Sequence, residues 1–250
     1  MVLLTWTPPY DWAWMVGFLQ ARAVAGVERF HDGGYSRSFG VEGHRGLIHL
    51  APDEEAQGLR VTLSPGLQPV AEICYARIGQ LFDLACDPRQ VARTLGDLAQ
   101  ARPGLRLPGA LDAFEQAVRA VLGQLVSVAM AARLTAKVAA GWGEPLAEAL
   151  IHLARAALSG ELPLTAPADI DTGLRQLQTL PGIGRWTANY FALRGWQAKD
   201  IFLPDDYLIK QRFPGMTPAA IARYARRWQP MRSYALLHIW YTDDWAPAAE

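Results

Sequence analysis

Two adjacent acidic residues stand where a helix is predicted to begin, a position that suits either structure or chemistry. Asp205 and Asp206 follow Pro204 and precede the apolar residues Leu208 and Ile209. Acidic residues in this position are typical helix N-caps, and capping alone can account for both of them. One acid is enough for a cap, however, and the helix dipole favours the charge of a second carboxylate there. The pair is therefore a candidate source of a fixed negative charge in a site.

A glycine-rich turn precedes the acid pair in the sequence. An amphipathic run that contains Leu174 and Leu177 stops there, and a new helix is predicted to begin near Arg185. Gly182 and Gly184 allow the backbone to take positive φ angles and to approach another surface closely. Amides of such a turn at a helix start can cradle an anion. The turn resembles the hairpin of the helix-hairpin-helix motif, which contacts a DNA phosphate without reading the base sequence; the alternative is a tight turn without a ligand.

A fixed carboxylate that follows a DNA-contacting hairpin suits one chemistry better than another. It can stabilise positive charge on a deoxyribose while the bond between base and sugar breaks. Phosphodiester hydrolysis would instead call for a cluster of acids that hold metal ions. Histidines offer no such cluster, because their spacing is not that of metal ligands, and we predict that they are surface or core residues. They are His31, His44, His49, His152 and His238.

Charge is distributed unevenly along a chain whose formal net charge is zero. Residues 171–232 carry 10 basic and 4 acidic side chains, whereas residues 1–170 carry 14 basic and 17 acidic ones. A basic segment within a neutral chain suits contact with a polyanion. A solvated helical face rich in arginine explains the same counts equally well. Charge by itself leaves both interpretations open.

Apolar patterning predicts a mixed structure for the first part of the chain. Strands are predicted at 2–6, 46–50 and 59–64, the last from strict alternation of apolar and polar residues. Helical spacing predicts one helix that is capped by Asp11 and another over 70–82. Strands in turn-punctuated groups with flanking helices indicate an antiparallel sheet covered on one face.

From about residue 88 onward the pattern becomes helical. An apolar stripe runs over 114–128, a further helix is predicted over 147–158, and another starts at Thr217 with Pro218 in its first turn. The fold class is therefore α+β, with an N-terminal sheet and flanking helices followed by an all-α region. We place the N-terminal α+β domain at 1–88 and the all-α region at 89–250.

Composition excludes several classes of protein. Hydrophobic residues make up 51% of the chain, which is enough for a sizeable core. The sequence contains no run of about 20 apolar residues, so no membrane span is predicted. The N-terminus lacks the basic start and the cleavage site of a signal peptide. The two cysteines, Cys74 and Cys86, cannot form a four-cysteine zinc or iron–sulfur site. These features predict a soluble, cytoplasmic protein.

The hairpin followed by a Pro-Asp pattern resembles the signature of the helix-hairpin-helix DNA glycosylases. Longer strings extend this resemblance to the bacterial 3-methyladenine DNA glycosylase II family over nearly the whole chain. They lie at 8–12, 101–108, 122–129, 186–196, 202–216 and 232–242. The resemblance implies an all-α helix-hairpin-helix catalytic region that divides into two helical subdomains around a DNA cleft. It also implies excision of alkylated purines from DNA.

By this resemblance, Asp206 is the catalytic residue and Asp205 is a cap or a support. An alkylated purine is cationic and already a good leaving group, so a carboxylate that stabilises the sugar cation and admits water is sufficient. The base must leave the duplex to reach that carboxylate. Trp186, Tyr190 and Trp240 match aromatic positions of the family's base pocket, with core packing as the alternative for each. Trp186 and Tyr190 lie four residues apart and share a helix face.

The resemblance also implies DNA contacts and a cation site. Gln124 and Leu125 match the place from which the family inserts a wedge into the gap left by the flipped base, whereas periodicity favours Leu125 as a core residue of the 114–128 stripe. The implied DNA contacts in the hairpin are Gly182, Gly184, Arg185 and Thr187. A monovalent cation is implied on the backbone carbonyls of Gln178, Leu180 and Ile183. No cofactor is expected for catalysis.

Trp186 also bears on the type of reaction. In relatives that cleave the DNA strand as well, a lysine at this place forms a Schiff base with the sugar. Lys137, Lys199 and Lys210 of this chain lie elsewhere. The resemblance thus implies a monofunctional glycosylase that acts as a monomer on alkylated bases such as 3-methyladenine in double-stranded DNA. A mismatch or oxidised-base glycosylase and a catalytically inactive duplex-DNA-binding protein are the alternatives.

One stretch departs from the family pattern. After residues 140–146 the family continues through a segment long enough for about two further helices. Here residues 147–154, which resemble the sequence beyond that segment, follow almost at once. A deletion would remove packing from the helical region that holds the hairpin. That loss is the basis of the inactive, DNA-binding alternative.

Overall fold

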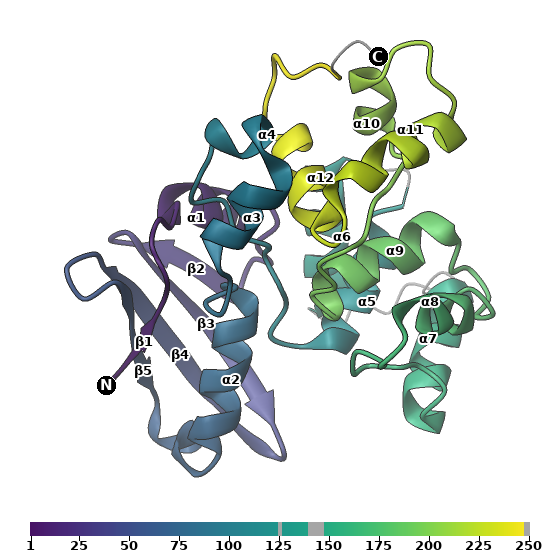
Figure 1. The fold of residues 1–250 in the computed structure, drawn as a ribbon. Coiled ribbons are helices and arrows are strands. Elements are labelled where there is room, and N and C mark those ends of the chain that lie inside the picture. Colours follow the sequence, from purple (N-terminus) through teal and green to yellow (C-terminus); the bar gives the residue numbers. More distant parts are fainter. Residues whose placement is uncertain (125–126, 140–147, 248–250) are drawn as a thin grey trace.

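A computed structural model describes residues 1–124, 127–139 and 148–247 of the chain. Its N-terminal part is a five-stranded antiparallel sheet in the order β1-β5-β4-β3-β2 (Figure 1). The predicted antiparallel sheet is therefore confirmed, and the strands predicted at 2–6, 46–50 and 59–64 correspond to β1, β4 and β5. The strands are β1 (Val2–Thr5), β2 (Glu28–His31), β3 (Gly34–Val41), β4 (His44–Asp53) and β5 (Gly58–Leu63).

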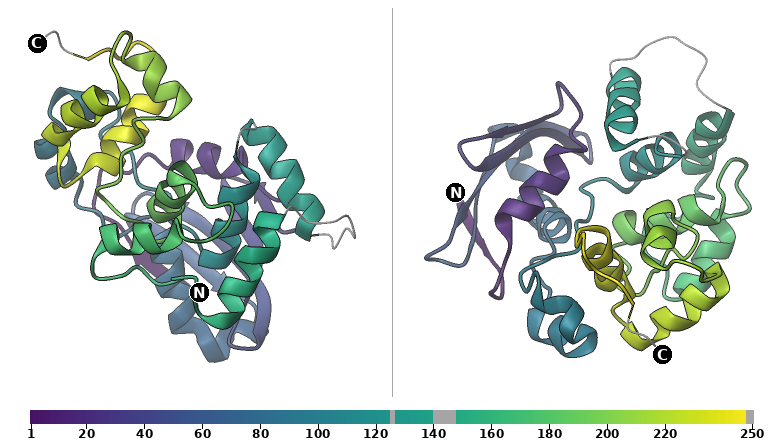
Figure 2. Two further views of the ribbon diagram at one scale, coloured as in Figure 1. Left: turned by 90° about the vertical axis from the view of Figure 1, so that its right-hand side faces the viewer. Right: turned by 90° about the horizontal axis from the view of Figure 1, so that it is seen from above.

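The sheet buries one face and exposes the other. Helices α1 (Trp12–Gln20) and α2 (Ala71–Leu81) lie between the sheet and the rest of the molecule, as the view from above shows (Figure 2). Tyr35, Leu50 and Val61 are directly opposite one another on β3, β4 and β5, and all three are buried. Because side chains alternate along a strand, the next cross-strand row points to solvent. This row is Ser36, His49 and Thr62.

Strands β2 and β3 lie in a part of the chain for which the sequence analysis predicted no strand. Both ends of β3 are two-residue hairpin turns, formed by Asp32 and Gly33 and by Glu42 and Gly43. All four turn residues have φ between +50° and +78°, which is the backbone of the hairpin turns that match strand twist. The Asp32-Gly33 pair favours such a turn, so the sequence did contain a signal that could have predicted the hairpin of β2 and β3.

The remainder of the chain is helical, as predicted from residue 88 onward. None of the described helices has the length and apolar character that crossing a membrane requires. The helices are α3 (Pro88–Leu95), α4 (Asp97–Gln100), α5 (Ala113–Leu122), α6 (Val128–Ala139), α7 (Glu148–Ser159), α8 (Ile170–Leu177), α9 (Arg185–Gly195), α10 (Tyr207–Arg212), α11 (Pro218–Tyr224) and α12 (Arg232–Trp240), with 3₁₀ turns η1 (Pro65–Val70) and η2 (Ala225–Trp228).

The apolar stripe over 114–128 does not form the single helix that its spacing predicts. Helix α5 ends at Leu122, and α6 is a separate helix that starts at Val128. The Ser127 hydroxyl oxygen accepts a hydrogen bond from the Met130 amide at 3.3 Å, which is the geometry of a helix start. Val128 is 43% exposed rather than part of the core. Leu125, for which this stripe suggested a core position, lies outside the described residues.

Two buried side chains fix the helices that carry the predicted site to the N-terminal half. On α9, the Arg194 guanidinium donates to the carbonyls of Pro108 at 2.6 Å and Gly109 at 2.9 Å. On α12, the Tyr234 hydroxyl donates to the Asp83 carboxylate at 2.8 Å. Such buried, fully paired contacts define one position for each helix. They therefore set where the residues at the ends of α9 and α12 meet.

Candidate active site

Asp206 precedes α10 and is the N-cap of that helix. Its Oδ1 accepts hydrogen bonds from the Leu208 amide at 3.1 Å and the Ile209 amide at 3.2 Å. The same oxygen accepts from Trp240 Nε1 at 3.0 Å, whereas Oδ2 accepts from Trp186 Nε1 at 3.2 Å. Indole groups from α9 and α12 therefore hold one carboxylate between them. A carboxylate has about four acceptor positions, two on each oxygen. Because Oδ2 accepts only the hydrogen bond from Trp186, it can accept one more.

Asp205 does not have the capping role that was one of its two predicted roles. The cap of α10 is Asp206 itself, and Asp205 instead forms an ion pair with Arg185, with 3.4 Å between NH1 and Oδ2. The Arg185 and Asp205 side chains are 62% and 45% exposed, so this pair contributes little to stability. One carboxylate thus combines the structural role and the candidate chemical role that the sequence analysis divided between two.

A cavity of about 420 Å³ lies beside the Asp206 carboxylate, within the size range of small-ligand pockets. Trp186, Tyr190, Trp240 and Asp206 all line it, so the fold brings together the four residues predicted for the base pocket and the catalysis. The other described residues in its wall are Arg22, Gln116, Arg119, Gly123, Ser127, Val128, Ala131, Ala132, Thr135, Arg194, Tyr207, Leu208 and Tyr241.

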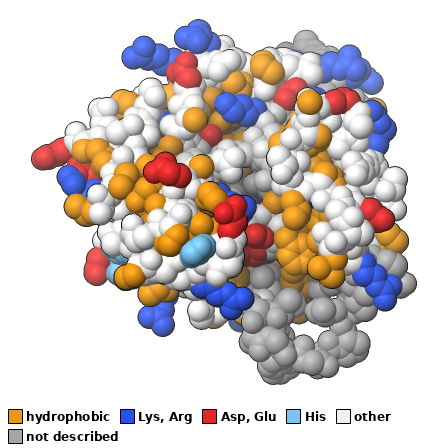
Figure 3. All heavy atoms as spheres, turned by 90° about the horizontal axis from the view of Figure 1, so that it is seen from below, with side chains coloured by type: hydrophobic (Ala, Val, Ile, Leu, Met, Phe, Trp, Pro, Cys, Tyr) orange, Lys and Arg blue, Asp and Glu red, His pale blue; other side chains and the backbone are white. Residues whose placement is uncertain are grey.

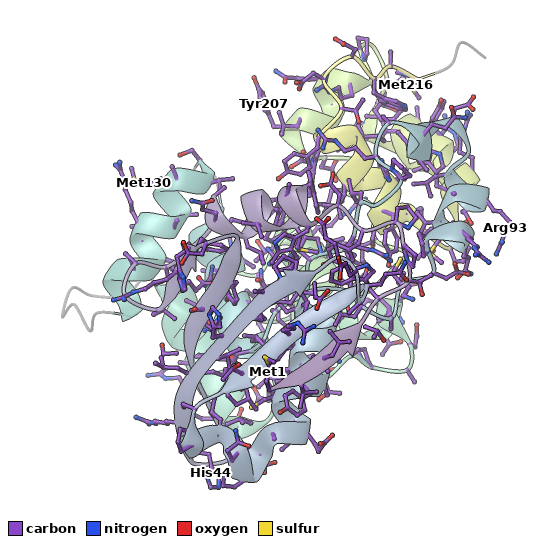
Figure 4. The ribbon with its side chains drawn as sticks, turned by 90° about the vertical axis from the view of Figure 1, so that its left-hand side faces the viewer. Met1, His44, Arg93, Met130, Tyr207 and Met216 are labelled. Carbon is purple, nitrogen blue, oxygen red and sulfur yellow. The ribbon has the colours of Figure 1, made fainter. Side chains whose placement is uncertain are left out.

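The aromatic residues of the cavity are arranged around the carboxylate. Trp186 and Tyr190 share one face of α9, as predicted, and their rings stack with centroids 4.9 Å apart and planes 10° apart. Each ring therefore has one face covered by the other, so at most one face of each ring can contact a ligand. Tyr207 is 69% exposed, and it projects into solvent from the start of α10, as Met130 does from α6 (Figure 4).

Arginines form a part of the wall that the sequence analysis did not identify. Arg119 is ion-paired with Glu28 at 2.7 Å and with Glu115 at 2.6 Å. Arg22 and Arg194 have no carboxylate partner among the described residues. Arg22 donates to the Phe18 carbonyl and the Tyr241 hydroxyl, and Arg194 donates to backbone carbonyls. The cavity is therefore lined by unneutralised positive charge at one place and by the Asp206 carboxylate at another.

These arginines change the acidity of Tyr190. Burial opposes ionisation of the phenol, but the guanidiniums of Arg22 and Arg194 more than offset it and lower the pKa of Tyr190 to about 8. By contrast, burial raises the pKa of Tyr35 and of Tyr234. Tyr190 is thus a tyrosine that ionises close to physiological pH.

We expect a spectroscopic titration to detect this tyrosine. The near-ultraviolet absorbance of tyrosinate should rise with a midpoint near pH 8, about two pH units below an ordinary tyrosine. Because the folded pKa is depressed, ionisation stabilises the native state as pH rises above 8, and this contribution is lost as pH falls through 8. The Tyr190→Phe variant should lack the midpoint. Absence of a transition near pH 8 in the wild type, or an unchanged transition near pH 8 in the variant, would contradict the assignment.

The predicted hairpin lies between α8 and α9, where the chain turns through Gly182 with φ of +81°. Gly184 is the N-cap of α9, and the amides of Arg185, Trp186 and Thr187 in the first turn have no acceptor within the described residues. Unpaired amides at a helix start form an anion site. Gly182 and Gly184 are exposed, and the Gln124 side chain donates to the Gly182 carbonyl at 3.0 Å.

Thr187 and Leu125 were both predicted as DNA contacts. The Thr187 side chain is only 3% exposed because it points into the core from α9, so a DNA contact at this residue could be made only by its backbone amide and stays a prediction. Leu125, the predicted wedge, lies outside the described residues.

The basic side chains of 171–232 do not form one solvent-exposed group, since Arg194 is buried and Arg232 is paired with Asp200 at 2.7 Å. On the face in Figure 3, charges of both signs are interspersed.

The sequence of the chain matches known proteins along nearly its whole length. Residues 1–112 match the family described as the AlkA N-terminal domain. DNA-3-methyladenine glycosylase 2 of Escherichia coli K12 is 58% identical over 279 aligned positions, which cover 99% of each chain. The chain belongs to the DNA-3-methyladenine glycosylase 2 family. Since the alignment is longer than the 250 residues of this chain, the E. coli relative has residues with no counterpart here.

Solved structures show that the fold of this glycosylase family member is shared more widely. The 3-methyladenine DNA glycosylase of Archaeoglobus fulgidus has 17% identity and a TM-score of 0.73 over 96% of this chain and 97% of its own. An 8-oxoguanine glycosylase/lyase of Clostridium acetobutylicum has 12% identity and a TM-score of 0.60 over 88% of this chain and 100% of its own. The two matched proteins act on different bases, and the second is also a lyase. The fold alone therefore does not decide the substrate or the type of reaction.

Proposed function

We propose that this chain is a monofunctional DNA glycosylase that flips alkylated purines such as 3-methyladenine out of double-stranded DNA and hydrolyses their N-glycosidic bond. The observation that supports this most strongly is the Asp206 carboxylate, which two indole N–H groups hold at the wall of an aromatic cavity. Membership of the DNA-3-methyladenine glycosylase 2 family supports the enzyme class.

The charges around the cavity suit the hydrolysis of a cationic nucleoside. In the ground state the positive charge lies on the alkylated base, and in the transition state it moves to the deoxyribose. Arg22 and Arg194 oppose a positive charge on a base in the cavity, whereas Asp206 stabilises one on the sugar. Both effects favour the transition state over the bound substrate, which is the requirement for catalysis. The departing base keeps the electron pair of the N-glycosidic bond and becomes neutral, and water then adds to the sugar carbon and releases a proton to solvent.

The reaction is proposed to stop at an abasic site. None of the described residues in the cavity wall is a lysine, and Trp186 stands where the resemblance places the lysine of strand-cleaving relatives. Lys199 and Lys210 are exposed on other surfaces. No amine in the described wall is therefore available for a Schiff base with the sugar.

The hairpin is proposed to hold the DNA backbone, together with a monovalent cation. The carbonyls of Gln178 and Ile183 accept no hydrogen bond from the described residues, and the Leu180 carbonyl accepts one from the Ile183 amide at 3.1 Å. All three can therefore serve as oxygen ligands, and a cation there would neutralise part of the phosphate charge. We propose that the enzyme acts as a monomer, because the carboxylate, the aromatic residues and the hairpin that the proposed reaction needs are all present in a single chain.

The proposed function is tested with methylated duplex DNA. We expect release of free 3-methyladenine, and strand breaks that appear only after alkali treatment. Borohydride should trap no covalent complex with this chain, whereas the C. acetobutylicum glycosylase/lyase on its own substrate is the positive control. A trapped complex would show lyase chemistry, and binding of the duplex without base release would favour the inactive alternative.

A further inference from the structure

Two histidines and a serine meet on the exposed face of the N-terminal sheet, away from the cavity. Ser36 Oγ on β3 lies 3.0 Å from His31 Nε2 on β2 and 2.8 Å from His49 Nδ1 on β4. The two imidazole rings are stacked, with centroids 5.3 Å apart and planes 16° apart. Sequence spacing predicted no such cluster, since His31 and His49 are 18 residues apart and only the strand register brings them together.

The hydrogen bonds of this cluster determine which nitrogen of each ring carries a proton and which accepts a hydrogen bond. His31 Nδ1 faces the Asp32 carboxylate at 3.4 Å, so this nitrogen carries the proton and Nε2 accepts from the Ser36 hydroxyl. The Ser36 oxygen in turn accepts from His49 Nδ1. Two ring nitrogens from different strands thus converge on one oxygen. These assignments follow from the hydrogen-bond network.

Convergent imidazole nitrogens with a carboxylate behind one ring are the features of a metal site. A histidine that ligates a metal commonly donates its other ring N–H to a carboxylate, as His31 does to Asp32. Imidazole ligands suit zinc, copper and nickel. We propose that His31 Nε2 and His49 Nδ1 bind a divalent transition metal ion, and that Ser36 Oγ and water complete its coordination. On binding, His49 changes to its other neutral tautomer, in which Nδ1 gives its proton to solvent and Nε2 takes one up from solvent, so that the Nδ1 lone pair is free for the metal.

The surroundings set the strength of this site. The His31 side chain is 48% exposed and His49 is also exposed, so the rings can rotate to the metal–nitrogen distance of about 2.0–2.1 Å. Among the described residues there is no cluster of three or more His, Cys, Asp or Glu side chains suited to a metal. With two imidazole ligands we expect weak, reversible binding. Since the ligands are together only in the folded sheet, the metal should raise the unfolding temperature.

The test measures binding of Zn²⁺ alone to the full chain by calorimetry, and the unfolding temperature with and without Zn²⁺. We expect one saturable site in the wild type. His31→Gln and His49→Gln should each weaken binding at least tenfold and abolish the rise in unfolding temperature.

His44→Gln is the matched control, because His44 is also on β4 but lies at its far end, at the turn from β3 (Figure 4). This variant should bind Zn²⁺ as the wild type does. Asp32→Asn should weaken binding less than loss of either ring. Absence of saturable binding in the wild type, or wild-type binding by His49→Gln, would overturn the proposal. Base release plays no part in this readout, so the result is independent of the proposed glycosylase activity.

Discussion

Asp206→Asn should reduce the rate of base release from methylated duplex DNA by about 100- to 1,000-fold. The substitution removes the negative charge that stabilises the sugar cation, but it keeps the side-chain oxygen that caps α10. The measurement is single-turnover release of free 3-methyladenine. Duplex binding should stay within about threefold of the wild type, because Asp206 faces the cavity and not the hairpin. A large loss of rate with unchanged affinity is the sign of an interaction made in the transition state.

The structural cost of this variant is small and can be measured separately. An asparagine amide nitrogen at the position of Oδ2 would meet Trp186 Nε1, and two donors cannot pair. The loss of this one hydrogen bond costs about 1 kcal/mol, so the unfolding temperature should fall only slightly. Asp205→Asn is the matched control, because it removes only an exposed ion pair with Arg185. The control should release base at the wild-type rate, and equal rates in all three proteins would remove Asp206 from the chemistry.

The parts of the site that sequence reasoning found are those that short segments encode. Asp206 follows a proline at a helix start, and Trp186 and Tyr190 are four residues apart on one helix, so local rules place each of them. Their meeting with Trp240 rested on the family resemblance, because the anchors that bring α12 to α9 are distant in sequence. The Tyr234 contact with Asp83 spans 151 residues and that of Arg194 with Pro108 spans 86.

The arginines of the cavity show what sequence patterns could not predict. Arg119 and Arg194 lie on α5 and α9, Arg22 lies in the turn that follows α1, and each looks like an ordinary polar position of its own segment. Their effect on Tyr190 depends on which of them has a carboxylate partner, and Arg119 has two such partners, Glu115 on its own helix and Glu28 on strand β2, which was not predicted. The missed strand thus concealed one of the two carboxylates that pair with Arg119.

Gly184→Asp should weaken duplex binding at least tenfold without lowering the stability of the fold. Gly184 is the N-cap of α9 and supplies no capping side chain, and a β-carbon there would meet no atom within 4 Å. Its φ of −79° and ψ of 174° are open to any residue. Aspartate is a favourable N-cap and interacts well with the helix dipole, so the unfolding temperature should stay equal or rise. The same negative charge lies where the unpaired amides of α9 are expected to receive a phosphate, and it repels that phosphate.

Gly184→Asn separates the charge from the change of shape. Asparagine caps the helix as well as aspartate does but carries no charge, so most of the loss in affinity should be absent from this variant. The measurement is duplex affinity over a range of salt concentrations. Gly184→Asp should lower the salt dependence by about one phosphate contact, a slope change of about 0.9. If the aspartate and asparagine variants bind duplex DNA equally well, the phosphate does not sit at this hairpin. A variant that is at least as stable as the wild type and yet binds DNA less tightly would show that the glycine at this cap serves DNA binding rather than folding.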